Sequence, residues 1–214
     1  MTLRRALEVA LVDTYHQAWR LVVLNVVLGA TATVVLLATL AARPAIVLAL
    51  LLGPIGAAVM HCAVTLAQTE DLRLPELLTG LRVHWRRGFA LGALLALAAI
   101  GGTVALPFYA KAGTWAWPLA ALSLYLLLAF AVFQLALWPM AVFEDERPFR
   151  EIVTEAARLF VRRPLGFAGL ALLLVLVNAV GVVAAIIPFL TLTIAFSFLV
   201  SAHYALPKNP AREA

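Results

Sequence analysis

Long apolar stretches separated by short polar segments dominate the chain. Six of them can be drawn as membrane spans, at residues 21–42, 45–68, 88–110, 116–142, 165–187 and 188–206. Each is close to the ~20 residues that a helix needs to cross ~30 Å of hydrocarbon. A membrane β-barrel would instead show shorter segments of alternating polarity. The pattern predicts an all-α, polytopic integral membrane protein with about six transmembrane helices in three hairpins.

The turns inside two of these hairpins are short. Spans 1 and 2 meet at Arg43 and Pro44, and spans 5 and 6 meet near Pro188 with no charge between them. Either pair can instead form a re-entrant or shortened hairpin, so full crossing by the second span is left open.

Two charged segments between the apolar stretches, residues 69–88 and 143–166, repeat one pattern. Their apolar positions coincide at an offset of 75 residues, which pairs Leu74, Leu77, Leu78, Leu81 and Trp85 with Phe149, Ile152, Val153, Ala156 and Phe160. This i, i+3, i+4, i+7, i+11 spacing is the apolar stripe of an amphipathic helix. Acidic residues precede each stripe and a pair of arginines follows it, which agrees with the helix dipole. An amphipathic helix at the membrane interface is therefore predicted before the second and third hairpins.

A weaker third copy lies at the N-terminus. At an offset of 66 residues, Leu11, Val12, Tyr15 and Trp19 occupy the stripe, but Glu8 stands at its first position. The chain is thus predicted to be one transmembrane domain, 1–214, of three repeat-like units, 1–68, 69–143 and 144–206, with a tail at 207–214. Amphipathic helices also arise beside membrane hairpins without duplication, and this alternative stays open.

The basic residues indicate an orientation. Of the 16 Lys and Arg residues, 14 lie before the first span, after the last, or in the second and fourth inter-span segments, and only Arg43 and Lys111 lie on the other side. An excess of Lys and Arg in short loops marks the cytoplasmic face, so both termini are predicted to be cytoplasmic. The same rule accounts for the net charge of +5, and we expect no nucleic-acid partner.

The family resemblance lies first in residues 53–88, GPIGAAVMHCAVTLAQTEDLRLPELLTGLRVHWRRG. This segment resembles the YesL-like family of bacterial membrane proteins. The shared features are a Gly-Pro with small residues in the second span, an acidic loop, and an amphipathic helix that ends in aromatic and basic residues. Residues 137–166, LWPMAVFEDERPFREIVTEAARLFVRRPLG, are similar to the family's second signature. The short third unit and brief tail depart from it. The resemblance implies an inner-membrane protein often linked to carbohydrate ABC transport systems, and it brings no catalytic residues.

Candidate chemistry within the spans is sparse. They contain no Asp, Glu, Lys or Arg, which argues against a proton-coupled antiporter or an intramembrane aspartyl protease. No Walker A, G-x-G-x-x-G, H-E-x-x-H or zinc-type cysteine motif occurs, so we predict no enzyme, cofactor or metal. The adjacent His61 and Cys62 point about 100° apart on a helix, which favours a histidine bonded to a neighbouring helix over a metal ligand. His203 and Tyr204 are expected to be interface anchors, and His16 and His84 to be solvated.

Three sets of side chains remain as candidates for function. The first is a partner-docking face on the amphipathic helices, made of Leu77, Leu81, Trp85, Ile152 and Phe160. The second is a lipid-headgroup site of Arg86, Arg87, Arg162 and Arg163. The third is a solute path along Asn25, Gln134 and Asn178, although such amides more often bond between helices.

The main hypothesis from the sequence is a non-enzymatic accessory or interaction module in the inner membrane. Its expected partners are the lipid bilayer, the membrane subunits of a carbohydrate ABC transporter and a second copy of the chain. The alternatives are a small neutral-solute transporter or channel and an anionic-lipid-binding membrane protein.

Overall fold

The computed structural model describes residues 2–42, 48–144, 146–183 and 193–207. Its helices are α1 (Leu3–Ala41), α2 (Leu52–Thr69), α3 (Pro75–Lys111), the 3₁₀ turn η2 (Thr114–Ala116), α4 (Trp117–Phe143), α5 (Phe149–Arg162), α6 (Pro164–Val183) and α7 (Ile194–Ala205). Within these ranges the structure contains no strand. The predicted all-α class is confirmed.

Five helical stretches are long and apolar enough to cross a membrane. They are Leu3–Ala41, Leu48–Thr69, Pro75–Lys111, Thr114–Phe143 and Pro164–Gly181. The helix α7 has 12 residues, fewer than the ~20 that a full span requires. Residues 43–47, the end of the fifth proposed span (184–187) and the start of the sixth (188–192) lie outside the described residues. The chain therefore carries five candidate spans in its described part, and these indicate a membrane-embedded protein.

Two of the three amphipathic segments continue directly into an apolar helix. The first is part of α1, whose backbone leaves helical geometry inside the helix only at Gln17 (φ −114°, ψ 19°). The second is the first part of α3, where no break separates it from the apolar half. The third forms a separate helix, α5, because Arg163 (φ −136°, ψ 50°) precedes Pro164. Proline disfavours helical geometry in the residue before it, so α5 ends at Arg162.

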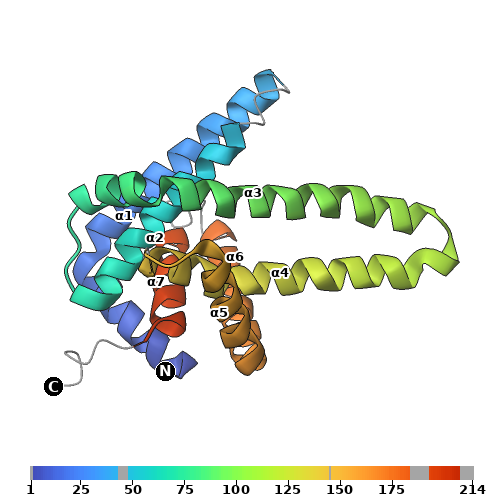
Figure 1. The fold of residues 1–214 in the computed structure, drawn as a ribbon. Coiled ribbons are helices and arrows are strands. Elements are labelled where there is room, and N and C mark those ends of the chain that lie inside the picture. Colours follow the sequence, from blue (N-terminus) through green and yellow to red (C-terminus); the bar gives the residue numbers. More distant parts are fainter. Residues whose placement is uncertain (1, 43–47, 145, 184–192, 208–214) are drawn as a thin grey trace.

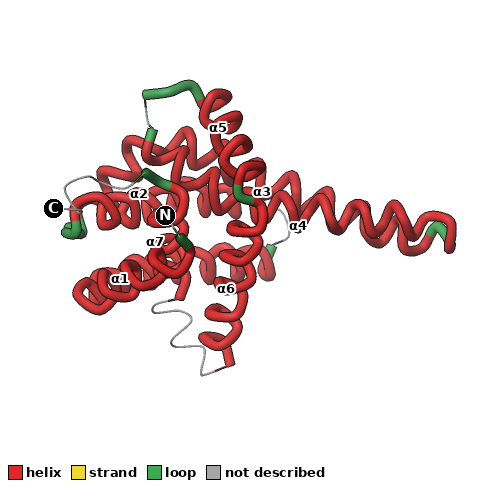
Figure 2. The backbone as a smooth tube through the Cα atoms, turned by 90° about the horizontal axis from the view of Figure 1, so that it is seen from below, coloured by secondary structure: helices red, strands yellow, loops and turns green. Residues whose placement is uncertain are grey.

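The helix α2 lies at the centre of the molecule, with α1, α3, α4 and α7 packed around it. The α3–α4 hairpin projects far from this centre, and the outer half of α1 extends in a different direction (Figures 1 and 2). Side chains along the projecting parts are exposed, among them Leu40, Val104 and Phe108. A helix that is apolar on all sides is expected where it contacts lipid. The projecting parts therefore fit a hydrocarbon environment.

Small residues bring the central helices together. Gly53 of α2 lies directly against the backbone of Gly88, and a Cβ atom placed on Gly92 would lie 3.0 Å from the Cα of Gly53. The spacing Gly88-x-x-x-Gly92 is one that lets a neighbouring helix approach closely. The separation of α2 and α3 is therefore set by backbone contact.

An aromatic series fixes α5 to the rest of the molecule. Phe160 of α5 lies 6.0 Å from the ring centroid of Phe133 on α4 and 6.0 Å from that of Phe167 on α6. Phe167 in turn packs edge-on against Tyr204 of α7 at 5.0 Å. The apolar face of α5 is thus occupied by other helices of the same chain.

Candidate functional site at the crossing of α2 and α3

The contact face between α2 and α3 is made of residues at i, i+4 spacing on each helix. Gly53 and His61 of α2 contact Glu76, Gly80, His84 and Gly88 of α3, and the spacing places Ala57 and Thr65 on the same side of α2. Residues four apart lie on one side of a helix. Because the helices run antiparallel, Gly53 meets Gly88 at one end of the face and His61 meets Gly80 further along.

His61 bridges two side chains of α3. Its Nδ1 lies 3.2 Å from Nε2 of His84, and its Nε2 lies 3.6 Å from Oε2 of Glu76. A Cβ atom on Gly80 would lie 2.8 Å from the Cβ of His61, so only glycine leaves room for this ring. His84 is 2% exposed. Glu76, His61 and His84 therefore form a continuous polar chain, named here the histidine chain, that leads from the surface to a buried imidazole.

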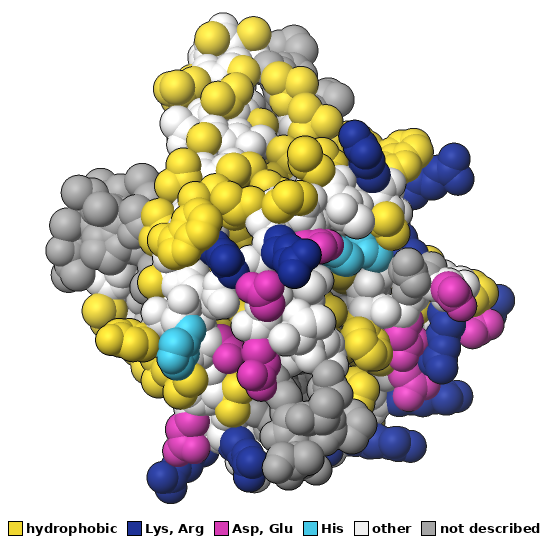
Figure 3. Space-filling model, turned by 90° about the vertical axis from the view of Figure 1, so that its left-hand side faces the viewer, with side chains coloured by type: hydrophobic (Ala, Val, Ile, Leu, Met, Phe, Trp, Pro, Cys, Tyr) yellow, Lys and Arg dark blue, Asp and Glu magenta, His cyan; other side chains and the backbone are white. Residues whose placement is uncertain are grey.

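A pocket of about 270 Å³ lies beside the outer end of the histidine chain. Its lining residues come from the end of α2, the following loop and the start of α3, and they are Thr65, Thr69, Asp71, Arg73 and Glu76. On the face that carries the α2–α3 loop, basic, acidic and histidine side chains gather between hydrophobic ones (Figure 3). The pocket thus connects Glu76 with solvent.

The loop after α2 is tied to the kink of α1. Arg20 donates to Oδ1 of Asp71 at 2.7 Å and to Oε1 of Gln17 at 2.6 Å. Asp71 also faces Arg73, whose Nε lies 3.5 Å from Oδ2. The hydrogen bond from Arg20, with a smaller contribution from Arg73, lowers the pKa of Asp71 below its ordinary value. The kink residue and the acidic loop therefore hold each other in place.

A second buried histidine joins the first and last helices. Nε2 of His203 lies 2.8 Å from Oδ2 of Asp13, and the two side chains are only 5% and 11% exposed. Tyr204 is also buried, against Gly166 and Phe167. The prediction that His203 and Tyr204 are interface anchors is therefore wrong, because α1 and α6 cover them.

His84 and His16, both predicted to be solvated, differ in exposure. The prediction of a solvated His84 is also wrong, because the small residues of α2 allow that helix to cover its ring. The exposed His16, whose ring contacts the Val12 carbonyl, agrees with the expectation.

The proposed docking residues fall into two groups. On α3, Leu77 and Leu81 are half-buried, and Trp85 is 46% exposed. On α5, Ile152 is fully buried and Phe160 lies in the aromatic series described above. The apolar stripe of α3 is thus partly open, whereas that of α5 is used within the chain.

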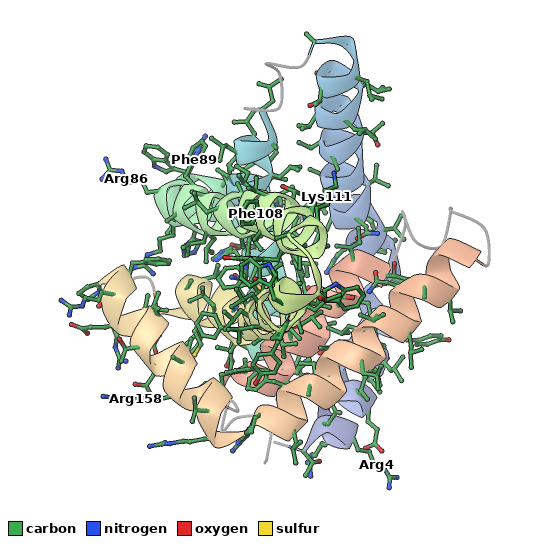
Figure 4. All side chains as sticks on the ribbon, turned by 90° about the vertical axis from the view of Figure 1, so that its right-hand side faces the viewer. Arg4, Arg86, Phe89, Phe108, Lys111 and Arg158 are labelled. Atoms are coloured by element: carbon green, nitrogen blue, oxygen red, sulfur yellow. The ribbon has the colours of Figure 1, made fainter. Side chains whose placement is uncertain are left out.

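The four arginines proposed for lipid headgroups also differ. Arg87 donates to the carbonyl oxygens of Ala141, Glu144 and Arg147, at 2.9, 2.6 and 2.7 Å respectively. It thereby caps the C-terminal end of α4 and fixes the turn toward α5. Arg86 extends outward (Figure 4), with its guanidinium 5.2 Å from the ring centroid of Trp85. Arg162 and Arg163 are exposed.

Two of the three proposed solute-path amides meet at the start of α7. Oδ1 of the fully buried Asn25 accepts a hydrogen bond from the backbone N–H of Ala195 at 2.8 Å. Asn178 donates to Oγ of Ser197 at 2.9 Å. Gln134 instead accepts from Nε1 of Trp138 within α4, at 3.0 Å. Asn25 therefore satisfies one of the backbone donors that a helix start leaves open.

Sequence reasoning missed the buried partners of His61, His84 and His203. The signal for the first two was available, because small residues and histidine recur at four-residue spacing in both 53–65 and 76–88. In the described part of the chain, no group of three His, Cys, Asp or Glu side chains is placed to hold a metal ion.

These features define a membrane-embedded, α-helical protein with a buried polar chain at a helix crossing. Comparison with known protein families, with curated proteins and with solved structures finds no match to this chain.

Proposed function

We propose that the protein is a non-enzymatic interaction module, an accessory component of another complex in the bacterial inner membrane, with both termini in the cytoplasm. Its docking face is the outer side of the first turns of α3, defined by Leu78, Leu81 and Trp85. The resemblance of residues 53–88 to the YesL-like family supports a carbohydrate ABC transporter as the complex.

The observation that carries this proposal is the direction in which α3 packs. Its buried side holds Gly80, His84 and Gly88, whereas Leu78 is 60% and Trp85 46% exposed. Successive positions are 100° apart, so the apolar stripe is turned about a quarter of a circle away from α2. An apolar stripe that the chain itself leaves open is available to a partner.

The composition of this face suggests how a partner would be held. Tryptophan and arginine are the residues most often found at the energetic centre of interfaces, and Arg86 lies over the ring of Trp85. Arg82 is exposed one turn before Arg86. A partner surface with an apolar groove and an acidic rim would complement both features.

The test is affinity purification of the tagged protein from native membranes in mild detergent, followed by mass spectrometry. Stoichiometric recovery of transporter permease subunits is the expected result. The variant Leu78→Ser with Trp85→Ser should lose them, since it removes the apolar side chains that this face exposes. Tyr15→Ser with Trp19→Ser, on the exposed face of α1, is the matched control and should retain them. Recovery of the protein alone, or retention of the subunits by the α3 variant, contradicts the proposal.

One observation favours a second candidate, the binding of anionic lipid. Arg86 and Trp85 are adjacent, exposed and stacked, an arrangement that suits a membrane interface. Native mass spectrometry of the purified protein would then show phosphatidylglycerol that is retained by the wild type and lost in Arg86→Gln. Equal lipid retention by both proteins would exclude Arg86 as the headgroup ligand.

A further inference from the structure

The pocket at the loop between α2 and α3 is separate from the proposed docking face. Its volume of about 270 Å³ lies just below the ~300–1,000 Å³ of pockets that hold drug-sized ligands, so it suits a smaller molecule. Thr65 and Thr69 supply hydroxyl groups, and Asp71, Arg73 and Glu76 supply charges of both signs. The arrangement of these charges therefore decides which class of small molecule the pocket fits.

The charge of Asp71 is balanced from outside the pocket. Its Oδ1 accepts a hydrogen bond from Arg20 of α1 at 2.7 Å. Arg73 reaches Oδ2 through Nε alone, at 3.5 Å, which is longer than an ordinary hydrogen bond. The side chain of Arg73 is 78% exposed, and the neighbouring Glu70 is exposed and not among the lining residues. The terminal nitrogens of Arg73 are therefore accessible to an anionic group in the pocket.

Glu76 supplies a negative charge to the same pocket. Its Oε2 lies 3.6 Å from Nε2 of His61, beyond the range of a hydrogen bond, and its side chain is 34% exposed. No ion pair joins Glu76 to Arg73, although both of these described residues line the pocket. Two opposite charges thus stand on the wall of one pocket without neutralising each other.

A ligand with a single kind of charge fits this pocket poorly. A simple anion would face the carboxylates of Asp71 and Glu76, and the described residues contain no group of three His, Cys, Asp or Glu side chains placed to hold a metal ion. A molecule that carries both charges can meet Arg73 and Glu76 together. Quaternary ammonium groups are typically bound by aromatic rings, and none of the described lining residues is aromatic. The cationic group that fits best is therefore a primary ammonium, whose N–H groups can bond to carboxylate and hydroxyl oxygens.

We propose that this pocket binds a small zwitterion, with its primary ammonium at Glu76 and its anionic group at Arg73. Ethanolamine phosphate has this chemistry, both as a free molecule and as the headgroup of phosphatidylethanolamine. The pocket lies at the end of α2, on the side that the basic residues predict to be cytoplasmic. This inference concerns the chain alone and does not depend on the proposed docking function.

The experiment is calorimetric titration of the full chain, purified in mild detergent, with free ethanolamine phosphate. Phosphocholine carries the same charges on a quaternary ammonium and is the matched probe, which should bind about tenfold more weakly or less. The lipid source is tested by native mass spectrometry of the protein released from nanodiscs that contain equal amounts of phosphatidylethanolamine and phosphatidylcholine. Preferential retention of phosphatidylethanolamine is the result expected if the headgroup is the ligand.

Two variants remove one charge each from the pocket. Arg73→Gln and Glu76→Gln should each weaken binding of the zwitterion by about tenfold or more. Arg158→Gln and Glu155→Gln, at an exposed ion pair on α5, are the matched controls and should bind as the wild type does. Circular dichroism of every variant shows whether it is folded.

Each outcome supports or overturns the proposal. Binding of free ethanolamine phosphate identifies a soluble ligand, and retention of phosphatidylethanolamine without such binding identifies the headgroup; both support the site. Absence of both overturns it, with the titration carried to about 10 mM. Equal binding of phosphocholine refutes the primary ammonium at Glu76. Unchanged binding by Arg73→Gln overturns the proposal even if Glu76→Gln does not fold.

Discussion

A single added methyl group at Gly88 tests whether the backbone contact between α2 and α3 holds the molecule together. In Gly88→Ala the new Cβ would lie 2.5 Å from the Cα of Pro54 and 2.8 Å from its nitrogen. Carbon atoms in ordinary contact are ~3.5–4.0 Å apart. The two helices would therefore have to separate by about 1 Å or more at this point, because a backbone atom cannot rotate away as a side chain does.

The expected cost follows from two opposing terms. Overpacking of a tightly packed site typically costs ~1–3 kcal/mol. Alanine is a better helix former than glycine by roughly 0.5–1 kcal/mol. Gly101→Ala on the same helix isolates the second term, because no atom lies within 4 Å of its new Cβ. The difference in unfolding free energy between the two variants should therefore be ~1–3 kcal/mol, with Gly88→Ala the less stable.

Thermal unfolding in a mild detergent, followed by circular dichroism or by the protection of Cys62 from a thiol reagent, measures this difference. For a chain of this size 1 kcal/mol corresponds to ~2–4 °C in Tm. Gly101→Ala should melt at or slightly above the wild-type temperature and Gly88→Ala several degrees below it. If the two variants melt together, the close contact of Gly53 and Gly88 does not exist in the folded protein, and the geometry given for the histidine chain fails with it.

Three further predictions concern single polar contacts. Arg87→Met removes three charge-assisted hydrogen bonds at the end of α4 and should lower the unfolding free energy by ~2 kcal/mol. Arg87→Lys should recover part of this loss. Equal stability of the wild type and Arg87→Met would refute the capping role. Asn25→Leu should lower the unfolding free energy by ~1–2 kcal/mol, because the Ala195 N–H loses its acceptor. Asn25→Asp keeps an acceptor oxygen, so amide exchange in α7 should stay as slow as in the wild type. Faster exchange would mean that the carboxylate does not reach the Ala195 N–H. Arg20 and Arg73 lower the native pKa of Asp71, so the stability that Asp71 contributes is complete above the ordinary pKa of 3.8 and is lost as the pH falls from there through the native pKa. The unfolding free energy of Asp71→Asn should therefore depend less on pH in this acidic range than that of the wild type. The same acid dependence in both proteins would contradict this role of Asp71.

The helical class and the approximate spans could be predicted from the sequence because hydrophobic length alone decides them. The contact of Gly88 and Gly92 with another helix was also predictable, since close approach needs small residues. For His61 and His84 the four-residue spacing of small residues marks the packed side of each helix, but it does not show which helix that side meets. His61 was expected to bond to a neighbouring helix, and the structure confirms this and identifies α3 as that helix.

The apolar stripes illustrate why the packing direction is hard to predict in such a chain. On α5 the stripe is buried, with Ile152 and Ala156 covered, as expected of an amphipathic helix whose other face is charged. On α3 the equivalent stripe is partly exposed, and glycine and histidine positions are buried instead. Where a helix continues into hydrocarbon, leucine gains little from contact with another helix, so close backbone packing decides which side is buried.

The contacts between ionisable side chains of different helices gather at one end of the molecule. Asp13 with His203, Arg20 with Asp71 and the histidine chain all lie near the charged segments, while the outer part of the α3–α4 hairpin shows mainly exposed apolar side chains (Figure 4). Contacts between charged groups therefore fix the helices at this end, and the uncharged hydrogen bonds of Asn25 and Asn178 join helices further along. A partner bound at the charged end would consequently act on the base of the projecting hairpin, because α3 carries both the histidine chain and the exposed stripe with Leu78 and Trp85.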